Sequence, residues 1–378
     1  MGKSRVYQQG RAHSGIVKEM GTVEQSTSMQ EVAIDHGVQP KRVAHGLDTL
    51  RFISAMWVAF YHGARFPVDR FIEPTSAFNK FLLLVGNTTW NGTAAVVVFF
   101  VISGFLIHGG NVGKQKVDLP SFWMRRGIRI IVPLTVTVLI AYALGASYVR
   151  VLDAILWTVY AEISYYLLYP LLLPFITKFG IGRILLISLA ISLAMIASRP
   201  TEIYLFAFGI KLTWLFNAPL WLMGCYLAER REQIGALSAK FPLWGLRCVS
   251  LIYCYASTIL ANHAGNVAIG YTWTIWIFGA HCMVWLDAEM RRGTGKSTLH
   301  MFEKFGLAGY SLYLTHKIPI NFVDTELSQL EPVTSWLVKL IAIAAIAWIF
   351  YRLVEWPTHK AARSFGRNNR PKAAVVET

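Results

Sequence analysis

Acidic side chains are scarce in this sequence, and charged residues of both signs are few. The 378 residues include 21 Asp and Glu against 36 Lys and Arg, which gives 15% charged residues and a formal net charge of +15. Soluble domains carry about a quarter charged residues. Together with 54% hydrophobic residues and a mean hydropathy of +0.44, this scarcity excludes an ordinary soluble domain and indicates a polytopic membrane protein.

Patterns for binding metals or forming disulfides are also missing. The cysteines at positions 225, 248, 254 and 282 lie in apolar segments without a CxxC pair. We therefore expect small packing residues, with no metal site and no disulfide. The basic excess comes without a stacking or groove-reading module, so it is assigned to cytosolic loops and not to nucleic-acid binding.

The first 46 residues contain no apolar run of the kind that a cleaved signal peptide requires. Residues 1–46 are predicted to form a disordered cytosolic tail, with a small docking helix as the alternative. Residues 47–357 would form the membrane domain, and residues 358–378 a basic cytosolic tail. No internal repeat of the inverted-repeat transporter type is visible.

Recurrent apolar stretches predict an all-α bundle of about ten transmembrane helices. The expected spans are 49–66, 92–108, 128–148, 155–177, 181–198, 208–229, 244–262, 268–287, 307–323 and 334–354. Several are shorter than the ~20 residues of a straight crossing, and burial among other helices would compensate. Residues 78–88 are too short to cross and are expected in an external loop or a re-entrant segment.

Charge asymmetry sets the expected orientation. With the N-terminus in the cytosol, most of the 36 Lys and Arg residues fall on cytosolic tails, loops and helix ends. The external loops instead carry acidic residues such as Asp69, Glu202 and Glu331. This distribution follows the positive-inside rule. Both basic termini then lie in the cytosol, which requires an even number of spans.

The stretch RFISAMWVAFYH places an arginine and a histidine in the first span. Arg51 and His62 would share one helix face, roughly 16 Å apart along the axis. An arginine at the cytosolic edge can bind a phosphate through its forked guanidinium, and a deeper histidine can act as a base. The alternative is that Arg51 anchors the helix and His62 hydrogen-bonds a neighbouring helix.

A second basic pair opens the third span in WMRRGIRIIVP. Arg126 and Arg129 are one helical turn apart and face the same way. Two guanidinium groups placed in this manner could clamp a phosphate. Anchoring at the cytosolic surface is the alternative, and it is preferred for Arg125.

Two more ionisable residues fall inside predicted spans, where a charge is costly and is a functional candidate by default. Glu162 lies in WTVYAEISYYLLYP and His316 in GYSLYLTHKIP. Their positions in the spans predict about the same depth for both as for His62. A helix–helix hydrogen bond is the structural alternative for each.

Three weaker candidates complete the polar set. Ser103 in FFVISGFLI lacks the GxSxG context of a nucleophile. Together with Gly104 it favours close packing of two helices. His108 and Glu355 fall near the cytosolic ends of spans and are expected at the membrane interface.

Six stretches resemble, in order, the motifs of the acyltransferase-3 family of integral-membrane O-acyltransferases. They span about residues 46–360 and read GLDTLRFISAMWVAFYH, FFVISGFLI, RRGIRIIVP, WTVYAEISYYLLYP, YSLYLTHKI and VEWP. Six motifs in this order, combined with about ten spans, are specific to the family. Thr158 stands where the family's W-S-L-x-x-E stretch has serine, and it keeps the hydroxyl.

The resemblance implies the roles of the polar residues. Family members carry an arginine, ten residues and a histidine in the first span, an RxxR in the third and a glutamate in the fourth. The expected catalytic residues are therefore His62 and Glu162. The expected donor-binding residues are Arg51, Arg126 and Arg129, with His316 and Ser103 as additional candidates. His62 would act as a general base or form an acyl-histidine intermediate.

The resemblance also implies the substrates and the location. The expected donor is cytosolic acyl-CoA, acetyl-CoA by default with succinyl-CoA as an alternative, and no bound cofactor is expected. The acceptor would be a sugar hydroxyl of an exopolysaccharide, O-antigen or lipid-linked precursor. The expected location is the bacterial inner membrane, beside polysaccharide-assembly machinery.

Two other functions fit parts of the same pattern. In a secondary transporter, His62, Glu162 and His316 would relay protons or bind a solute. A structural subunit of a polysaccharide-secretion complex would carry a degenerate site. The intact residues Arg51 and His62 disfavour that second alternative.

The orientation is testable with reporter fusions. A reporter fused after residue 370 should be active only in a cytosolic format, because this arrangement keeps most Lys and Arg inside. A fusion within the predicted external loop before Glu331 serves as the opposite control. Periplasmic activity after residue 370 would contradict the predicted orientation.

Overall fold

The computed structural model describes residues 41–206, 208–263, 270–292 and 305–367, and every regular element in these ranges is helical. The all-α prediction is confirmed. The α-helices are α1 Lys41–Ala59, α2 Ala77–Thr88, α3 Gly92–Gly109, α4 Leu119–Leu144, α5 Ala146–Phe179, α6 Ile181–Ser198, α7 Gly209–Glu229, α8 Arg231–Ser238, α9 Leu243–His263, α10 Tyr271–Arg292, α12 Gly309–Thr315, α13 Lys317–Glu326, α14 Pro332–Phe350 and α15 Trp356–Arg367. Short helical turns lie at η1 Phe60–Ala64, η2 Val68–Arg70 and η3 Tyr351–Glu355.

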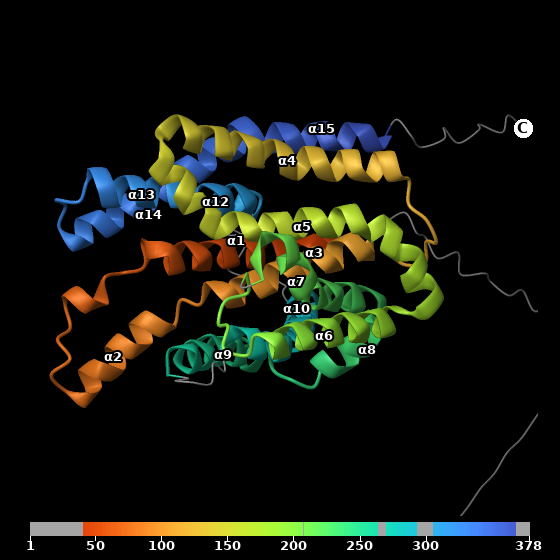
Figure 1. Ribbon diagram of the computed structural model, residues 1–378, viewed down its shortest axis with the longest axis horizontal. Helices are drawn as coiled ribbons and strands as arrows, with labels where there is room; N and C mark the ends of the chain where they lie inside the picture. Colours follow the sequence, from red (N-terminus) through yellow and green to blue (C-terminus); the bar gives the residue numbers. More distant parts are fainter. Residues whose placement is uncertain (1–40, 207, 264–269, 293–304, 368–378) are drawn as a thin grey trace, which may run out of the picture. The chain divides into compact units, whose positions relative to one another are not determined.

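Helix α3 lies at the centre of the bundle and packs against α1, α7 and α10 (Figure 1). It is apolar along its length, and neighbouring helices bury most of its side chains. Helix α6 packs on α7, α9 packs on α10, and α15 runs beside α4. The outer helices expose large apolar side chains, including Leu139, Leu186 and Ile341. Apolar surface on both faces of a helix is expected where one face meets lipid.

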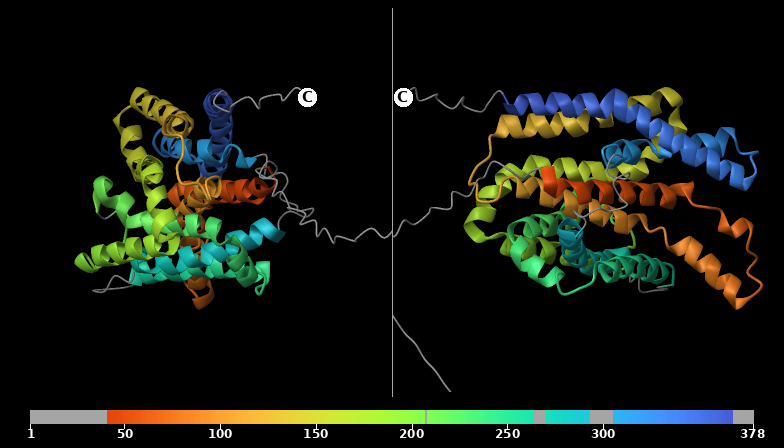
Figure 2. Two further views of the ribbon diagram at one scale, coloured as in Figure 1. Left: turned by 90° about the vertical axis from the view of Figure 1, so that its right-hand side faces the viewer. Right: turned by 180° about the vertical axis from the view of Figure 1, so that it is seen from behind.

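Six described helical segments are long and apolar enough to cross a membrane. They are Ala77–Gly109, Leu119–Leu144, Ala146–Phe179, Ile181–Ser198, Leu243–Ala261 and Pro332–Phe365. The other expected spans coincide with α1, α7, α10 and the α12–α13 pair, which are not among these six segments. The number of ten crossings therefore stays a prediction. The start of α1 and the end of α15 lie at the same end of the bundle (Figure 2), as an even number of crossings requires.

Several helix boundaries differ from the sequence prediction. Helix α1 already begins at Lys41, inside the expected N-terminal tail, and α15 continues to Arg367, inside the expected C-terminal tail. Residues 1–40 and 368–378 lie outside the described ranges. Helix α5 has 34 residues, which at 1.5 Å per residue is about 51 Å, well beyond a 30 Å hydrocarbon core. Residues 78–88 form most of helix α2, so this segment is helical, and its place in an external loop or as a re-entrant segment stays a prediction.

Two predicted spans are interrupted, and each interruption carries a histidine. Helix α1 passes into the π-helical turn Phe60–Ala64, where Gly63 has φ 120°. The expected span 307–323 is two helices, α12 and α13, which meet at His316. Pro319 explains this break, because it has no N–H to donate to the carbonyl of Thr315 four residues earlier.

Helices α3 and α7 approach each other backbone to backbone. A Cβ added at Gly104 would lie 1.9 Å from the carbonyl oxygen of Trp221, and one at Gly224 would lie 2.1 Å from that of Val101. Only glycine fits at such distances, and small residues allow this approach between membrane helices. The sequence prediction that Gly104 serves close helix packing is therefore confirmed.

The glycine contact gives a stability prediction. The added methyl group in Gly104→Ala must push α3 and α7 apart. Overpacking of this kind lowers the free energy of unfolding by about 1–3 kcal/mol or more. The measurement is thermal unfolding in detergent, together with protein abundance in the membrane. Gly109→Ala is the matched control, because its added methyl would lie 3.8 Å from Ala228, an ordinary contact. If the two variants unfolded at the same midpoint temperature, the close-packing role of Gly104 would be contradicted.

Candidate functional site

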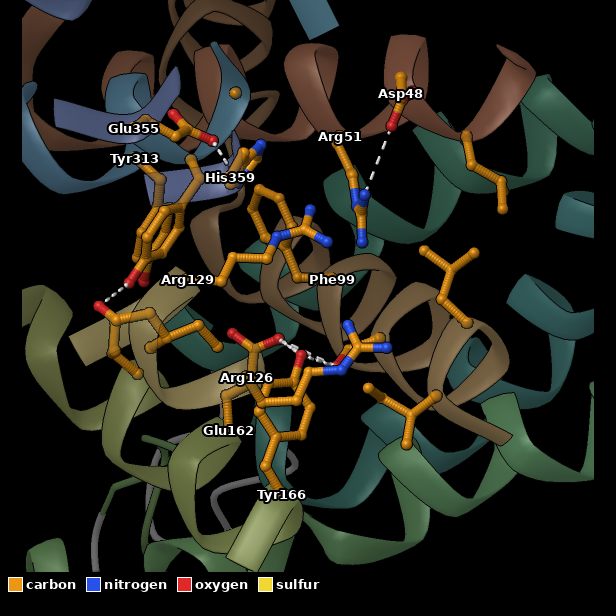
Figure 3. A pocket seen from close by; sticks show the side chains of 18 of the residues that line it. Asp48, Arg51, Phe99, Arg126, Arg129, Glu162, Tyr166, Tyr313, Glu355 and His359 are labelled. Carbon is orange, nitrogen blue, oxygen red and sulfur yellow. Dashed lines mark hydrogen bonds and ion pairs between the residues drawn. The ribbon is translucent and has the colours of Figure 1, made fainter. Parts of the chain in front are cut away.

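A cavity of about 540 Å³ lies between α1, α3, α4, α5, α12 and the segment η3–α15. Its size is within the roughly 300–1,000 Å³ range of small-molecule sites. Charged and aromatic side chains are interspersed along the lining, with Arg126 beside Tyr166 (Figure 3). Most of the site residues that the sequence singled out meet at this cavity.

Three arginines from two helices line the cavity: Arg51 of α1, and Arg126 and Arg129 of α4. The Arg51 Nη1 atom is 3.3 Å from Asp48 Oδ1, and the Arg126 guanidinium lies over the Tyr166 ring at 5.8 Å. Within the described ranges neither Arg126 nor Arg129 forms an ion pair with a carboxylate. Partly buried guanidinium groups without carboxylate partners form a site for an anion such as a phosphate.

Glu162 of α5 lines the same cavity and is part of a hydrogen-bonded network. Its Oε1 atom accepts hydrogen bonds from Ser103 Oγ, at 2.9 Å, and from the hydroxyl of Tyr166. The Trp221 indole N–H in turn donates to Ser103 Oγ at 3.3 Å. The network joins α3, α5 and α7, and it brings the weaker candidate Ser103 into contact with the predicted catalytic carboxylate.

His62 and His316 form a pair outside the cavity lining. His62 Nδ1 lies 2.9 Å from His316 Nε2, and the two rings are stacked with centroids 5.2 Å apart. His316 is fully buried, and its Nδ1 atom lies 2.8 Å from the carbonyl oxygen of Tyr313. The break between α12 and α13 and the π-helical turn of η1 therefore bring two histidines together from opposite ends of the sequence.

These contacts define the tautomers of the neutral rings. A carbonyl oxygen only accepts hydrogen bonds, so Nδ1 of His316 carries the hydrogen and its Nε2 is an acceptor. His62 Nδ1 must then donate to His316 Nε2 at 2.9 Å. The remaining ring nitrogen, His62 Nε2, keeps its lone pair and can accept a proton.

The structure separates residues that the sequence placed together. Arg51 lines the cavity and His62 does not, although the two were expected on one helix face. That expectation assumed a regular α-helix, whereas the helix widens into a π turn before His62. Glu162 hydrogen-bonds to Ser103 and Tyr166 and not to either histidine.

The sequence prediction missed Glu355 as a lining residue. Glu355 was expected at the membrane interface, but it is 2% exposed and lines the cavity. Its carboxylate accepts hydrogen bonds from the backbone N–H of Ser311, at 2.9 Å, and from the Ser311 hydroxyl. His359, also in the lining, has its Nε2 atom 3.5 Å from Glu355 Oε1. The signal in the sequence was a carboxylate close to the end of a strongly apolar stretch.

His108 was also expected at the membrane interface, and it too is buried. Its Nδ1 atom lies 3.0 Å from the Tyr169 hydroxyl, and its Nε2 atom lies 3.2 Å from a Glu229 oxygen. These contacts link the ends of α3 and α7 to the second half of α5. They give His108 a helix-joining position outside the cavity lining.

The remaining polar candidates have local partners. Arg125 reaches the cavity but donates a hydrogen bond to Ser121 of its own helix, which suits the anchoring interpretation. Cys225, Cys254 and Cys282 are buried, whereas Cys248 is exposed on α9. Among the described residues, no group of three or more His, Cys, Asp or Glu side chains could hold a metal ion.

Comparison with known proteins adds an independent line of information. A family model described as an acyltransferase domain matches residues 44–352. The O-acetyltransferase OatA proteins of Staphylococcus aureus strains NCTC 8325 / PS 47, COL and MRSA252 are each 24% identical over 389 residues. These alignments cover 84% of this chain and 58% of each relative, so the chain spans little more than half the length of those relatives. No solved structure matches the chain.

The family match contains most of the residues that form the site. It runs from α1 to the end of α14 and includes Arg51, His62, Arg126, Arg129 and Glu162. It also covers more than three quarters of the chain, from residue 44 to residue 352 of 378. The chain therefore belongs to the acyltransferase-3 family of membrane proteins.

Proposed function

We propose that this protein transfers a short acyl group, acetyl by default, from acyl-CoA to a sugar hydroxyl. The observation that carries the proposal is the convergence of Arg51, Arg126 and Arg129 on one cavity, where the α4 pair forms no ion pair among the described residues. The acceptor would be an exopolysaccharide, O-antigen or lipid-linked sugar. The proposed location is the bacterial inner membrane with both termini in the cytosol, beside polysaccharide-assembly machinery.

The cavity suits the shape of the donor. A coenzyme A thioester has phosphates at one end, and its acyl group at the other. The phosphates would bind the three guanidinium groups, since arginine forks match phosphate oxygens. The thioester would then extend toward Phe99 and Tyr313 of the same lining, and the Tyr313 ring centroid lies 6.1 Å from that of His316, the partner of His62.

The proposed transfer step uses the free ring nitrogen of His62. His62 Nε2 takes the proton of the acceptor hydroxyl while the hydroxyl oxygen attacks the thioester carbonyl carbon. A C–O bond forms, the C–S bond breaks, and the thiolate of coenzyme A takes up the proton. His316 is a positioning residue in this scheme, because its hydrogen bond at 2.9 Å sets the tautomer of His62. Direct attack by His62, forming an acyl-histidine, is the alternative chemistry.

Glu162, which the family resemblance makes a catalytic candidate, lines the cavity and contacts neither histidine. Its carboxylate accepts hydrogen bonds from Ser103 and Tyr166, and it lines the cavity that also holds Arg126. A carboxylate there orients the two hydroxyl groups and balances part of the positive charge of the clamp. In the proposed mechanism Glu162 is therefore a positioning residue.

A secondary transporter is the rival function, supported by the histidine pair inside the membrane domain. The two functions differ in their dependence on acyl-CoA. The purified enzyme should bind coenzyme A, and a strain lacking the gene should lose one acyl group per repeat of its surface polysaccharide. Mass spectrometry of polysaccharide from the deletion and parent strains measures this loss directly.

The arginine clamp gives a binding prediction. Replacing Arg126 and Arg129 together by Ala should weaken coenzyme A binding by roughly 3–6 kcal/mol, since each charge-assisted hydrogen bond contributes about 1.5–3 kcal/mol. Replacement by Lys should restore part of the affinity, because an ammonium has no fork. Titration calorimetry on the purified protein measures both effects.

The control for this experiment is a neighbouring arginine with a local partner. Arg125→Ala removes a cation from the same helix, but one that donates to Ser121. It should change the affinity much less than the double variant. The clamp is refuted if the double Ala variant folds normally and keeps the affinity of the parent protein.

The base role of His62 gives a catalytic prediction. His62→Ala should lower acyl transfer by about 10²–10⁴-fold, as expected for loss of a general base, while membrane abundance and coenzyme A binding stay unchanged. Polysaccharide acylation and immunoblots of membranes measure the two quantities side by side. His281→Ala is the control, because His281 is an intramembrane histidine whose Nε2 lies 3.0 Å from Ser250, away from the cavity. Near-normal acylation by the His62 variant would reduce His62 to a helix-joining role.

A further inference from the structure

A lysine lies directly beside the histidine pair. Lys317 follows His316 and opens α13, which packs against the turn η1 that carries His62. Its ammonium group is close enough to both imidazole rings to interact electrostatically with them. Lys317 is partly buried and falls within the predicted span 307–323. A charge is costly at such a position and indicates a functional residue.

No carboxylate neutralises this lysine within the described ranges. Lys317 forms no ion pair there. Asp324 lies about two helical turns further along α13 and interacts with Lys317 only at longer range. The Asp324 Oδ1 atom is 2.5 Å from Lys339 Nζ. Asp324 is therefore already engaged by another cation, and Lys317 can accept an anionic partner from a ligand.

A second donor without a partner lies on the same face of α13. Asn321 is one helical turn after Lys317, so the two side chains project from the same side of the helix. The Nδ2 atom of Asn321 is buried and has no hydrogen-bond partner in the part of the chain that the structure describes. A buried donor that stays unpaired costs free energy, and a ligand oxygen would remove that cost. An ammonium and an amide at this spacing suit a ligand with anionic oxygen atoms.

The histidine pair can be approached from outside the donor cavity. His62 is partly exposed, and its neighbours Tyr61 and Gly63 are exposed, with 42% of the Tyr61 surface accessible. The Tyr61 ring lies beside the His62 ring, with centroids 5.1 Å apart. A ligand at this surface can therefore reach His62 without passing the arginines that line the cavity.

We propose that Lys317, together with Asn321, binds an anionic group of the acceptor sugar, a carboxylate or a phosphate, and so places the acceptor hydroxyl at His62. The inference rests on the proposed function and adds the chemical class of the acceptor. An anionic group at this position also assists the transfer step. It neutralises Lys317, whose positive charge opposes the charge that His62 gains with the proton.

The test compares acceptors that differ only in charge. Oligosaccharide repeats from the surface polysaccharide of the deletion strain are used in three forms: untreated, with carboxyl groups reduced to alcohols, and with phosphate groups removed. Purified full-length protein and acetyl-CoA are mixed with each form, and mass spectrometry follows the acetylated product. Loss of the anionic group should raise the KM for the acceptor at least about tenfold, as expected for a lost hydrogen bond to a charged group. The treatment that raises KM shows whether the group is a carboxylate or a phosphate.

Replacement of the lysine should remove the preference for the charged acceptor. In Lys317→Gln, the KM for the untreated repeat should rise at least about tenfold, to the value for the uncharged repeat, while kcat and coenzyme A binding change little. Lys317→Arg keeps the cation and should keep most of the preference. Asn321→Ala is the second variant, for the case that Lys317→Gln does not fold, and it should raise the same KM severalfold. Lys211→Gln is the matched control, because it removes an exposed lysine at the start of α7 and should keep the parent KM.

The outcomes separate this inference from the proposed function. A higher KM for the charged repeat in Lys317→Gln or Asn321→Ala, with Lys211→Gln unchanged, supports the anion site. A repeat that contains neither carboxylate nor phosphate overturns it, as does an equal KM for all three forms, and both results leave acyl transfer standing. An unchanged KM in every folded variant also overturns it. If the parent protein acetylates none of the three forms, the proposed function fails, and the anion site with it.

Discussion

The close contact between helices α3 and α7 is the constraint on which the site depends. Gly104 allows the α3 backbone to reach the Trp221 carbonyl of α7. The neighbouring residue Ser103 is then held between the Trp221 indole, at 3.3 Å, and Glu162 of α5, at 2.9 Å. A wider spacing of α3 and α7 would break this network, leave polar groups unpaired inside the membrane domain, and move one wall of the cavity.

Irregular backbone occurs at the positions where the histidines sit. In a bilayer every backbone N–H and C=O needs a partner, so irregular segments are tolerated only where protein surrounds them. The Trp336 indole donates to the carbonyl of Ala64 at 3.1 Å, and His316 Nδ1 lies 2.8 Å from the carbonyl oxygen of Tyr313. The interruptions of α1 and of the α12–α13 segment therefore orient the two rings and determine which nitrogen of His62 is free.

Opposite charges meet in the cavity. The arginines Arg51, Arg126 and Arg129 come from α1 and α4. The carboxylates of Glu162 and Glu355 line the same cavity, and each accepts a hydrogen bond from a serine hydroxyl. In the proposed mechanism the guanidinium groups bind the phosphates of the donor, and the histidine pair takes part in the proton transfer. Donor binding and proton transfer then depend on different residues, which can be changed one at a time.

The amino-acid sequence is enough to predict the class of the fold and most of the polar residues that line the cavity. Low charge and long apolar runs imply helices, because a bilayer requires backbone hydrogen bonds within each segment. The arginines, Glu162 and both histidines stood out because ionisable residues are costly in such segments. Periodicity along one helix could not reveal that a π turn separates His62 from Arg51, or that Pro319 splits a span at His316. The contacts of Ser103, Glu355 and Tyr313 depend on helix rotation and on neighbours far away in the chain, and only tertiary packing decides those.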